Sequence, residues 1–199
     1  MRDWEAWYQA GETPWDRGSA APPLGELLER VEPGFWGGGT VLVPGCGAGH
    51  DVRMLAGVGL DVLGLDLSET AVKLVSGRER AGGERYEVGD FLAAGWSGGR
   101  SFSAIWEHTC YCAIDPDLRS RYARSAAEVL EPGGVLAGVF YLTPTKREGE
   151  ERQPPFAVTV EALEACFAPW FECVEGAVPE RAYPGREGKE WLAVFRRRA

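Results

Sequence analysis

A glycine-rich segment is the part of this 199-residue chain whose residue types and spacing point most directly to chemistry. It reads Val43-Pro44-Gly45-Cys46-Gly47-Ala48-Gly49-His50-Asp51 and follows the apolar run 40–43. Glycines at alternate positions let a chain turn sharply after a strand and bring its backbone close to a ligand. Asp66 ends the next apolar run, about 20 positions after Gly45, which is the offset at which a carboxylate binds ribose hydroxyls. The two features together predict a site for an adenosine-containing cofactor.

The position of the third glycine indicates which cofactor this is. A dinucleotide fingerprint reads G-x-G-x-x-G, whereas His50 stands at that place here and Gly49 comes one residue early. This spacing favours a ligand without a pyrophosphate, chiefly S-adenosylmethionine. The carboxylate of Asp51 suits an ammonium group better than a pyrophosphate. A nicotinamide site and a plain glycine-rich turn remain as alternatives.

A second carboxylate follows the third predicted strand, in Gly89-Asp90-Phe91. In the same geometry Asp90 reaches the adenine amino group and Phe91 packs on the adenine ring. The alternative is a strand-ending turn followed by a phenylalanine of the core.

Strand-like and helix-like runs alternate along the chain. The predicted strands are 40–43, 60–66, 85–88, 102–106, 135–142 and two near 171–178 and 190–195, and the predicted helices are 51–57, 68–76, 116–129 and 160–167. This alternation predicts an α/β fold: a doubly wound, mostly parallel, seven-stranded Rossmann-like sheet with helices on both faces, in one domain of residues 1–199. Ligands of such sheets bind at the carboxyl ends of the strands, where the residues above lie.

Composition and charge exclude several classes of function. The chain has 21 Lys and Arg against 30 Asp and Glu, a net charge of −9, so we expect no nucleic-acid partner. No apolar stretch approaches the roughly 20 residues of a membrane span, and the acidic N-terminus does not resemble a signal peptide, so we expect a cytoplasmic protein without membrane contact. The five cysteines include no CxxC pair, which predicts neither a disulfide framework nor a metal site.

Several further motifs carry a family resemblance that spans almost the whole chain. They are Trp4-x3-Tyr8, Gly11-Glu12-Thr13-Pro14-Trp15-Asp16, the glycine segment through Val52, Gly64-Leu65-Asp66-Leu67-Ser68, Gly89-Asp90-Phe91, Thr109-Cys110-Tyr111-Cys112-Ala113-Ile114-Asp115-Pro116, Arg119, Tyr122-Ala123, Leu130-Glu131-Pro132-Gly133-Gly134 and Pro154-Pro155-Phe156. With these motifs the chain resembles the thiopurine and halide/thiol methyltransferases, a family of class I enzymes that use S-adenosylmethionine.

The resemblance implies that residues 1–35 form a helical lid over the cofactor, with Trp4, Tyr8 and Trp15 lining it. Aromatic faces attract a sulfonium cation, which agrees with this role. The alternative is that these rings only anchor a terminal helix to the core.

One departure from the family lies after the fourth predicted strand. Plant halide/thiol enzymes typically read Asp-Tyr-Thr there, and this chain reads Glu107-His108-Thr109. His108 then stands next to the transferred methyl group, where it hydrogen-bonds the nucleophile or the cofactor, or is only a strand-end histidine. Cys110 and Cys112 follow closely; on an extended segment their side chains point to opposite faces, so we expect small buried side chains and no shared metalloid ligand.

These observations give one functional hypothesis. The candidate cofactor-binding residues are Trp4, Tyr8, Trp15, Gly45, Cys46, Gly47, Gly49, Asp51, Asp66, Leu67, Asp90, Phe91, Glu107 and His108, and the candidate catalytic residues are His108 and Glu107. We expect an S-adenosylmethionine-dependent methyltransferase that transfers a methyl group in line to a small soft nucleophile: a thiol, hydrosulfide or halide. Alternatives are a heterocyclic thiol or metalloid oxyanion as acceptor, or a protein that binds S-adenosylmethionine without catalysis. The expected partner is a small molecule, and we expect a monomer, with an oligomer left open.

Overall fold

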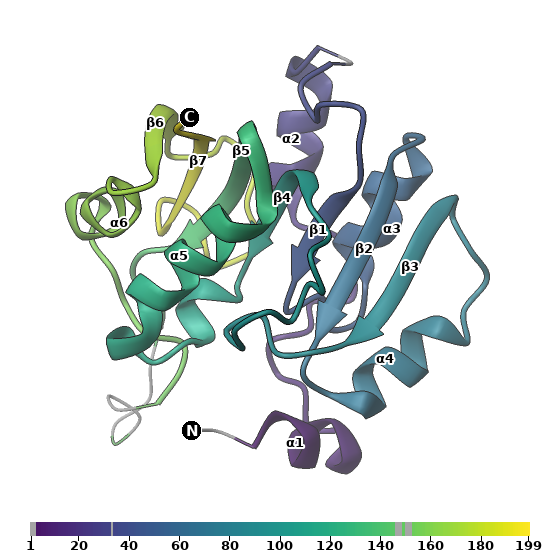
Figure 1. The fold of residues 1–199 in the computed structure, drawn as a ribbon. Helices are drawn as coiled ribbons and strands as arrows, with labels where there is room; N and C mark the ends of the chain where they lie inside the picture. Colours follow the sequence, from purple (N-terminus) through teal and green to yellow (C-terminus); the bar gives the residue numbers. More distant parts are fainter. Residues whose placement is uncertain (1–2, 33, 146–148, 150–152) are drawn as a thin grey trace.

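Seven strands form a single sheet at the centre of the fold (Figure 1). The computed structural model describes residues 3–32, 34–145, 149 and 153–199. The strands are β1 (Val41–Pro44), β2 (Asp61–Asp66), β3 (Gly83–Val88), β4 (Phe102–His108), β5 (Leu130–Tyr141), β6 (Phe171–Ala177) and β7 (Glu190–Arg197). Their order across the sheet is β3-β2-β1-β4-β5-β7-β6. The first five strands run parallel, and β7 pairs antiparallel with both β5 and β6.

Helices cover both faces of this sheet. They are α1 (Trp4–Ala10), α2 (Pro22–Arg30), α3 (His50–Gly57), α4 (Glu69–Ser76), α5 (Arg119–Val129) and α6 (Val160–Phe167), with two short 3₁₀ turns, η1 (Tyr111–Ala113) and η2 (Pro116–Leu118). Apolar residues of α2 and α3 pack on one face of the sheet, and those of α5 and α6 pack on the other. Since both faces are covered, the central strands are continuous apolar runs: β1 is buried throughout and β4 along all but its last residue.

The predicted doubly wound sheet with helices on both faces is confirmed, with differences at some boundaries. The predicted helix 116–129 is divided, because η2 precedes α5. The fifth strand begins at Leu130, five residues before its predicted start, since Leu130 pairs with Phe102 before a bulge restores the register. That residues 1–199 form one domain stays a prediction, and residues 1, 2 and 33 of the predicted lid lie outside the described part of the chain. Within that part, no helix is long and apolar enough to cross a membrane.

The strand order places a switch point at β1. The chain runs from β1 outward to β2 and β3, then returns to the other side of β1 with β4. Loops after β1 and β4 therefore diverge and leave a crevice at the carboxyl edge of the sheet. The N-terminal helix α1 lies at this edge and packs against α4 (Figure 1).

Candidate active site

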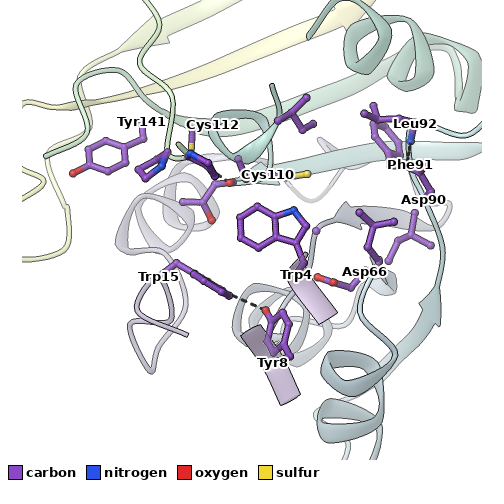
Figure 2. Close-up of a pocket in the computed structure, with 18 of the residues that line it drawn as sticks. Trp4, Tyr8, Trp15, Asp66, Asp90, Phe91, Leu92, Cys110, Cys112 and Tyr141 are labelled. Atoms are coloured by element: carbon purple, nitrogen blue, oxygen red, sulfur yellow. Dashed lines mark hydrogen bonds between the residues drawn. The ribbon is translucent and has the colours of Figure 1, made fainter. Parts of the chain in front are cut away.

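A cavity opens at the carboxyl ends of the parallel strands (Figure 2). Its wall combines residues of the N-terminal segment, of the loops after β1 to β5, and of the connection before β7. The lining residues are Trp4, Tyr8, Trp15, Gly45, Leu65, Asp66, Leu67, Gly89, Asp90, Phe91, Leu92, Thr109, Cys110, Cys112, Ala113, Ile114, Tyr141, Pro154, Pro155 and Arg186. Eight of the fourteen predicted cofactor residues are among them: Trp4, Tyr8, Trp15, Gly45, Asp66, Leu67, Asp90 and Phe91.

The glycine loop after β1 forms one side of the cavity. Gly45 and Gly47 have φ angles of 61° and 50°, in the left-handed region that favours glycine. A Cβ at Gly45 would meet the Cys110 sulfur at 2.9 Å, and one at Gly47 would meet the Tyr8 hydroxyl at 2.8 Å. The loop therefore needs glycine at these positions, both for its turn and for the close approach of neighbouring side chains.

Asp66 ends β2 beside this loop. Its carboxylate accepts hydrogen bonds from the backbone N–H of Gly47 at 2.8 Å and of Ser68 at 2.9 Å. Burial raises the pKa of Asp66, and these backbone bonds oppose that rise. Each oxygen of a carboxylate has a second lone pair, so Asp66 retains acceptor capacity toward the cavity that it lines.

Asp90, Phe91 and Leu92 form the wall beyond Asp66. The Asp90 carboxylate accepts a hydrogen bond from the backbone N–H of Leu92 at 2.8 Å, which fixes a tight turn after β3. Phe91 is only 5% exposed and packs on Tyr122, with ring centroids 5.0 Å apart. It therefore belongs to the core as well as to the cavity wall.

Three aromatic rings of the N-terminal segment close the cavity on another side. Trp15 packs edge-on against Trp4, with centroids 5.2 Å apart, and its indole N–H donates to the Tyr8 hydroxyl at 3.3 Å (Figure 2). Burial raises the pKa of the Tyr8 phenol, so this hydroxyl remains protonated. The cavity wall here is apolar and rich in π faces.

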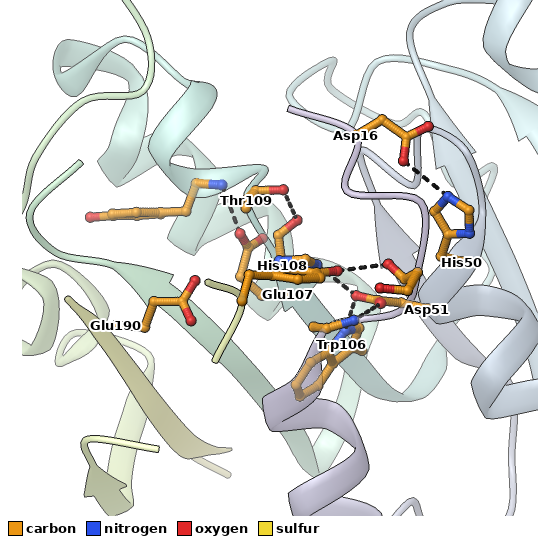
Figure 3. Close-up of polar contacts among 12 residues, drawn as sticks. Asp16, His50, Asp51, Trp106, Glu107, His108, Thr109 and Glu190 are labelled. Atoms are coloured by element: carbon orange, nitrogen blue, oxygen red, sulfur yellow. Dashed lines mark hydrogen bonds and ion pairs between the residues drawn. The ribbon is translucent and has the colours of Figure 1, made fainter. Parts of the chain in front are cut away.

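The six other predicted cofactor residues do not line the cavity. They are Cys46, Gly47, Gly49, Asp51, Glu107 and His108. Asp51, expected to face an ammonium group, instead accepts hydrogen bonds from the Ala21 backbone N–H at 2.7 Å and the Trp106 indole at 2.8 Å (Figure 3). Both partners come from distant parts of the chain, and they leave Asp51 buried behind the cavity.

His108 completes the hydrogen bonds of Asp51. Its Nδ1 lies 2.8 Å from Asp51, and because a carboxylate only accepts, Nδ1 carries the hydrogen (Figure 3). Although burial alone would raise the pKa of Asp51, the charge and hydrogen bond of His108 hold it below its usual value. The other ring nitrogen, Nε2, is buried and has no hydrogen-bond partner among the described residues.

Glu107 holds the turn that follows β4. One carboxylate oxygen accepts from the backbone N–H of Tyr111 at 2.8 Å, and the other accepts from the Tyr122 hydroxyl. Burial raises the pKa of Glu107 to about 7. Both oxygens are therefore occupied and the side chain is 1% exposed, so Glu107 contacts the turn and does not face the cavity.

The turn itself begins with a strained residue. Thr109 lines the cavity with a φ of 63°, which is rare for a β-branched side chain. Cys110 precedes the 3₁₀ turn η1 in a helical conformation and Cys112 lies in it, so the extended segment predicted for them is wrong, and both line the cavity. Burial raises the pKa of Cys112 to about 12, which keeps this thiol neutral. Among the described residues, no group of three or more His, Cys, Asp or Glu side chains is placed to hold a metal ion.

Tyr141 and Arg186 are among the wall residues that the sequence predictions did not name as site residues. The Arg186 guanidinium lies 4.5 Å from the Tyr141 ring centroid and donates to Glu190 at 3.0 Å. Tyr141 could have been found as the last residue of its strand. Arg186 could not, because it lies in an irregular stretch before β7 with no motif around it.

The cavity has two ends, separated by Trp4 in Figure 2. Asp66, Asp90 and Phe91 lie at one end, which we call the donor end because the sequence predicts that these residues bind the methyl donor. Cys112 and Tyr141 lie at the other, which we call the acceptor end, and Arg186 belongs there because it stacks on Tyr141. Among the described lining residues, the donor end therefore carries two carboxylates, and the acceptor end carries the Arg186 cation within a mostly apolar wall.

Comparison with known proteins agrees with this arrangement. The family described as thiopurine S-methyltransferase matches residues 1–191. The chain belongs to this family. It is thus a class I methyltransferase of the kind that depends on S-adenosylmethionine.

Curated relatives of the family match over most of the chain. A probable thiol methyltransferase 2 of Arabidopsis thaliana is 34% identical over 98% of this chain and 84% of its own length. A thiocyanate methyltransferase 1 of the same plant is 33% identical with the same coverage. A thiopurine S-methyltransferase of Pseudomonas paraeruginosa is 32% identical over 84% of this chain and 82% of its own length.

Solved structures share the fold. One, from work on the conversion of a disulfide bond into a thioacetal group during echinomycin biosynthesis, has a TM-score of 0.77 and 26% identity, covering 98% of this chain and 91% of that one. A TehB-like methyltransferase of Corynebacterium glutamicum has a TM-score of 0.66 and 21% identity, covering 98% and 94%.

Proposed function

We propose that this protein transfers the methyl group of S-adenosylmethionine to a small, soft, anionic nucleophile: a thiolate, hydrosulfide or halide. The observation that supports this most is the acceptor end, where the buried cation of Arg186 stands among lining residues that are mostly apolar in the described part of the chain. The names of relatives, which refer to thiols, thiocyanate and thiopurines, point to the same class of acceptor.

The donor end fits S-adenosylmethionine residue by residue. Asp66 has acceptor capacity for the ribose hydroxyls, and the wall of Asp90 and Phe91 suits adenine, with a carboxylate for its amino group and a ring for its face. The backbone of Gly45 lines the cavity, while Trp4 and Tyr8 would present π faces to the sulfonium. When bound, this cofactor supplies an electrophilic methyl group.

The acceptor end suits a nucleophile that is already anionic. The Arg186 guanidinium would attract and orient the anion, and Glu190 would hold the guanidinium in place from behind. The apolar remainder of the wall would exclude water, since a desolvated sulfur or halide anion is a stronger nucleophile. Such a reaction needs alignment more than a general base.

A catalytic role for His108 and Glu107 remains a prediction. Neither side chain lines the cavity. Both residues directly precede Thr109, which lines it together with residues of the turn η1. We propose that Glu107 acts by positioning this turn. Among the described residues, His108 Nε2 has no hydrogen-bond partner, and we propose that it would take up the proton of a neutral thiol through an intervening water molecule.

An acceptor panel tests the proposal. The purified protein is incubated with S-adenosylmethionine and iodide, thiocyanate, hydrosulfide, an alkyl thiol or a thiopurine, and methylated product and adenosylhomocysteine are measured together. We expect equal amounts of both products with at least one soft anion, and loss of turnover in Asp66→Ala. Binding of the cofactor without turnover of any acceptor would favour a non-catalytic binding protein instead. Turnover of only a thiopurine or a metalloid oxyanion would support the alternative acceptors.

A further inference from the structure

A carboxylate of the N-terminal helix is bonded to the start of α4. Glu5 Oε2 accepts from the Ser68 hydroxyl at 2.6 Å and from the Thr70 backbone N–H at 3.2 Å. Glu5 Oε1 accepts from the Thr70 hydroxyl at 2.6 Å and from the Gln9 amide at 2.9 Å. Three hydrogen bonds therefore join α1 to α4 through one side chain.

The start of α4 is a favourable place for this charge. Ser68 is the N-cap of the helix, and its hydroxyl also accepts from the Ala71 backbone N–H at 3.0 Å. The first turn of a helix carries unpaired N–H groups and the positive end of the helix dipole, which favour an anion. The hydroxyls of Ser68 and Thr70 lower the pKa of Glu5 to about 2, so the side chain is ionised at neutral pH.

Ser68 connects this contact to the donor end of the cavity. Its hydroxyl donates to Glu5, while its backbone N–H donates to Asp66 at 2.9 Å. The carboxylate of Glu5 and the carboxylate of Asp66, which is proposed to bind the ribose, therefore both accept hydrogen bonds from Ser68. A displacement of α1 would therefore disturb Ser68, one of the residues that donate a hydrogen bond to Asp66.

The rest of α1 contributes little burial to hold the helix in place. None of residues 4–10, all of which the structure describes, is buried. Two of them, Trp4 and Tyr8, line the cavity on either side of Glu5 in the sequence. The following segment is attached more firmly, since Ala21 is 1% exposed and the Tyr183 hydroxyl donates to the Ser19 carbonyl at 2.7 Å. Trp4 and Tyr8 also contact Trp15 within the same segment. Glu5 supplies the side-chain hydrogen bonds that join their helix to α4.

We propose that Glu5 is a positioning residue for the methyl donor: by its bonds to Ser68 and Thr70 it holds Trp4 and Tyr8 over the donor end of the cavity. Release of this contact then allows adenosylhomocysteine to leave and the next donor to enter. The inference rests on the proposed function, because it assumes that this end of the cavity binds the donor.

The test compares Glu5→Gln, Thr70→Val and the double variant with the wild-type protein. Glu12→Gln is the matched control, because Glu12 is an exposed acid of the same segment. Thr70 is chosen in preference to Ser68, since Ser68 also caps α4. Calorimetry gives the dissociation constant of adenosylhomocysteine, and stopped-flow tryptophan fluorescence gives its dissociation rate.

We expect Glu5→Gln to speed the dissociation of adenosylhomocysteine about tenfold, the scale of a lost hydrogen bond to a charged group. KM for the donor should rise, and KM for the acceptor should stay unchanged. The double variant should change the rate less than the product of the single effects, because both substitutions remove the same contact.

Two results would overturn the inference. The first is a dissociation rate in Glu5→Gln equal to that in Glu12→Gln while wild-type protein binds adenosylhomocysteine normally; the proposed function would then stand alone. A lower melting temperature with an unchanged rate belongs to this result and means that the contact is only structural. The second is absence of adenosylhomocysteine binding by the wild-type protein. This result would contradict the proposed function as well.

Discussion

The Asp66 carboxylate accepts a hydrogen bond from the backbone N–H of Gly47 at 2.8 Å. This bond joins the end of β2 to the loop after β1, so the two sequence features that predicted a cofactor site are physically one unit. The loop needs its glycines to make the turn, and the turn presents an N–H to the carboxylate. A substitution at Gly47 or Asp66 is therefore expected to change the position of the other residue.

We predict that Asp66→Ala weakens adenosylhomocysteine binding at least about tenfold, because it removes the charged acceptor proposed for the ribose hydroxyls. Titration calorimetry measures the change. Asp117→Ala, at an exposed aspartate that does not line the cavity, serves as the control. Unchanged affinity in Asp66→Ala would remove this residue from the donor site.

We predict that Arg186 determines recognition of the acceptor anion. Replacing it alone would leave Glu190 buried without its cation and would destabilise the fold. The variant to test is therefore Arg186→Met with Glu190→Gln. KM for iodide or thiocyanate should rise about tenfold or more, since a charged hydrogen-bond donor is lost, while KM for the donor should not change. Arg181→Met, at an exposed arginine paired with Glu29, is the control, and equal effects of the two variants would contradict the prediction.

We predict that Glu107 makes the fold less stable as the pH rises through neutrality. Its pKa is raised to about 7 from an ordinary value of 4.5, because it is buried. The folded protein then binds one more proton than the unfolded chain between these two values, so the contribution is complete below pH 4.5 and lost as the pH rises through about 7. The loss is on the order of 3 kcal/mol.

Denaturant unfolding of the wild-type protein and Glu107→Gln from pH 4.5 to pH 8 checks this, since the difference between them isolates Glu107. The wild-type protein should lose stability relative to the variant across this range. Parallel curves would show that Glu107 does not titrate in it.

We predict that His108→Gln affects acceptors according to their protonation. For a thiol whose pKa lies above the assay pH, turnover should fall about tenfold or more, because a base must remove the thiol proton. Iodide carries no proton, so its turnover should remain near that of the wild-type protein. The assay compares kcat for both acceptors at pH 7. An equal loss for both would mean that His108 acts only through Asp51, to which Nδ1 is bonded.

The sheet and the donor end could be predicted from the sequence because their signals are local. Strands of apolar β-branched residues, the glycine loop and the carboxylates at strand ends each lie within a few neighbouring residues. Asp51 shows the limit of this reasoning. Its position after the glycine loop suggested a ligand contact, whereas Ala21, Trp106 and His108, all distant in sequence, take up its hydrogen bonds.

The residues that sequence reasoning missed depend on tertiary contacts. Arg186 reaches the cavity only because β7 runs antiparallel to β5 and brings its preceding residues to the carboxyl edge. Glu5 resembles any acid on a surface helix until α4 is placed beside it. Cys110 and Cys112 were expected on an extended segment, but Glu107 binds the backbone N–H of Tyr111 and favours a 3₁₀ turn.

Because the last strand runs antiparallel to β5, Arg186 reaches the same end of the cavity as Cys112 and Tyr141. The two ends of the cavity therefore come from different halves of the sequence. The walls of the donor end come from segments before residue 93, whereas Cys112, Tyr141 and Arg186 all come after residue 108. Under the proposed function, the choice of nucleophile can therefore diverge during evolution without changes in the half proposed to hold the methyl donor. A chimera that joined residues 1–101, which end before β4 and so leave His108 to the later half, to the corresponding later half of a relative should inherit the acceptor preference of that relative.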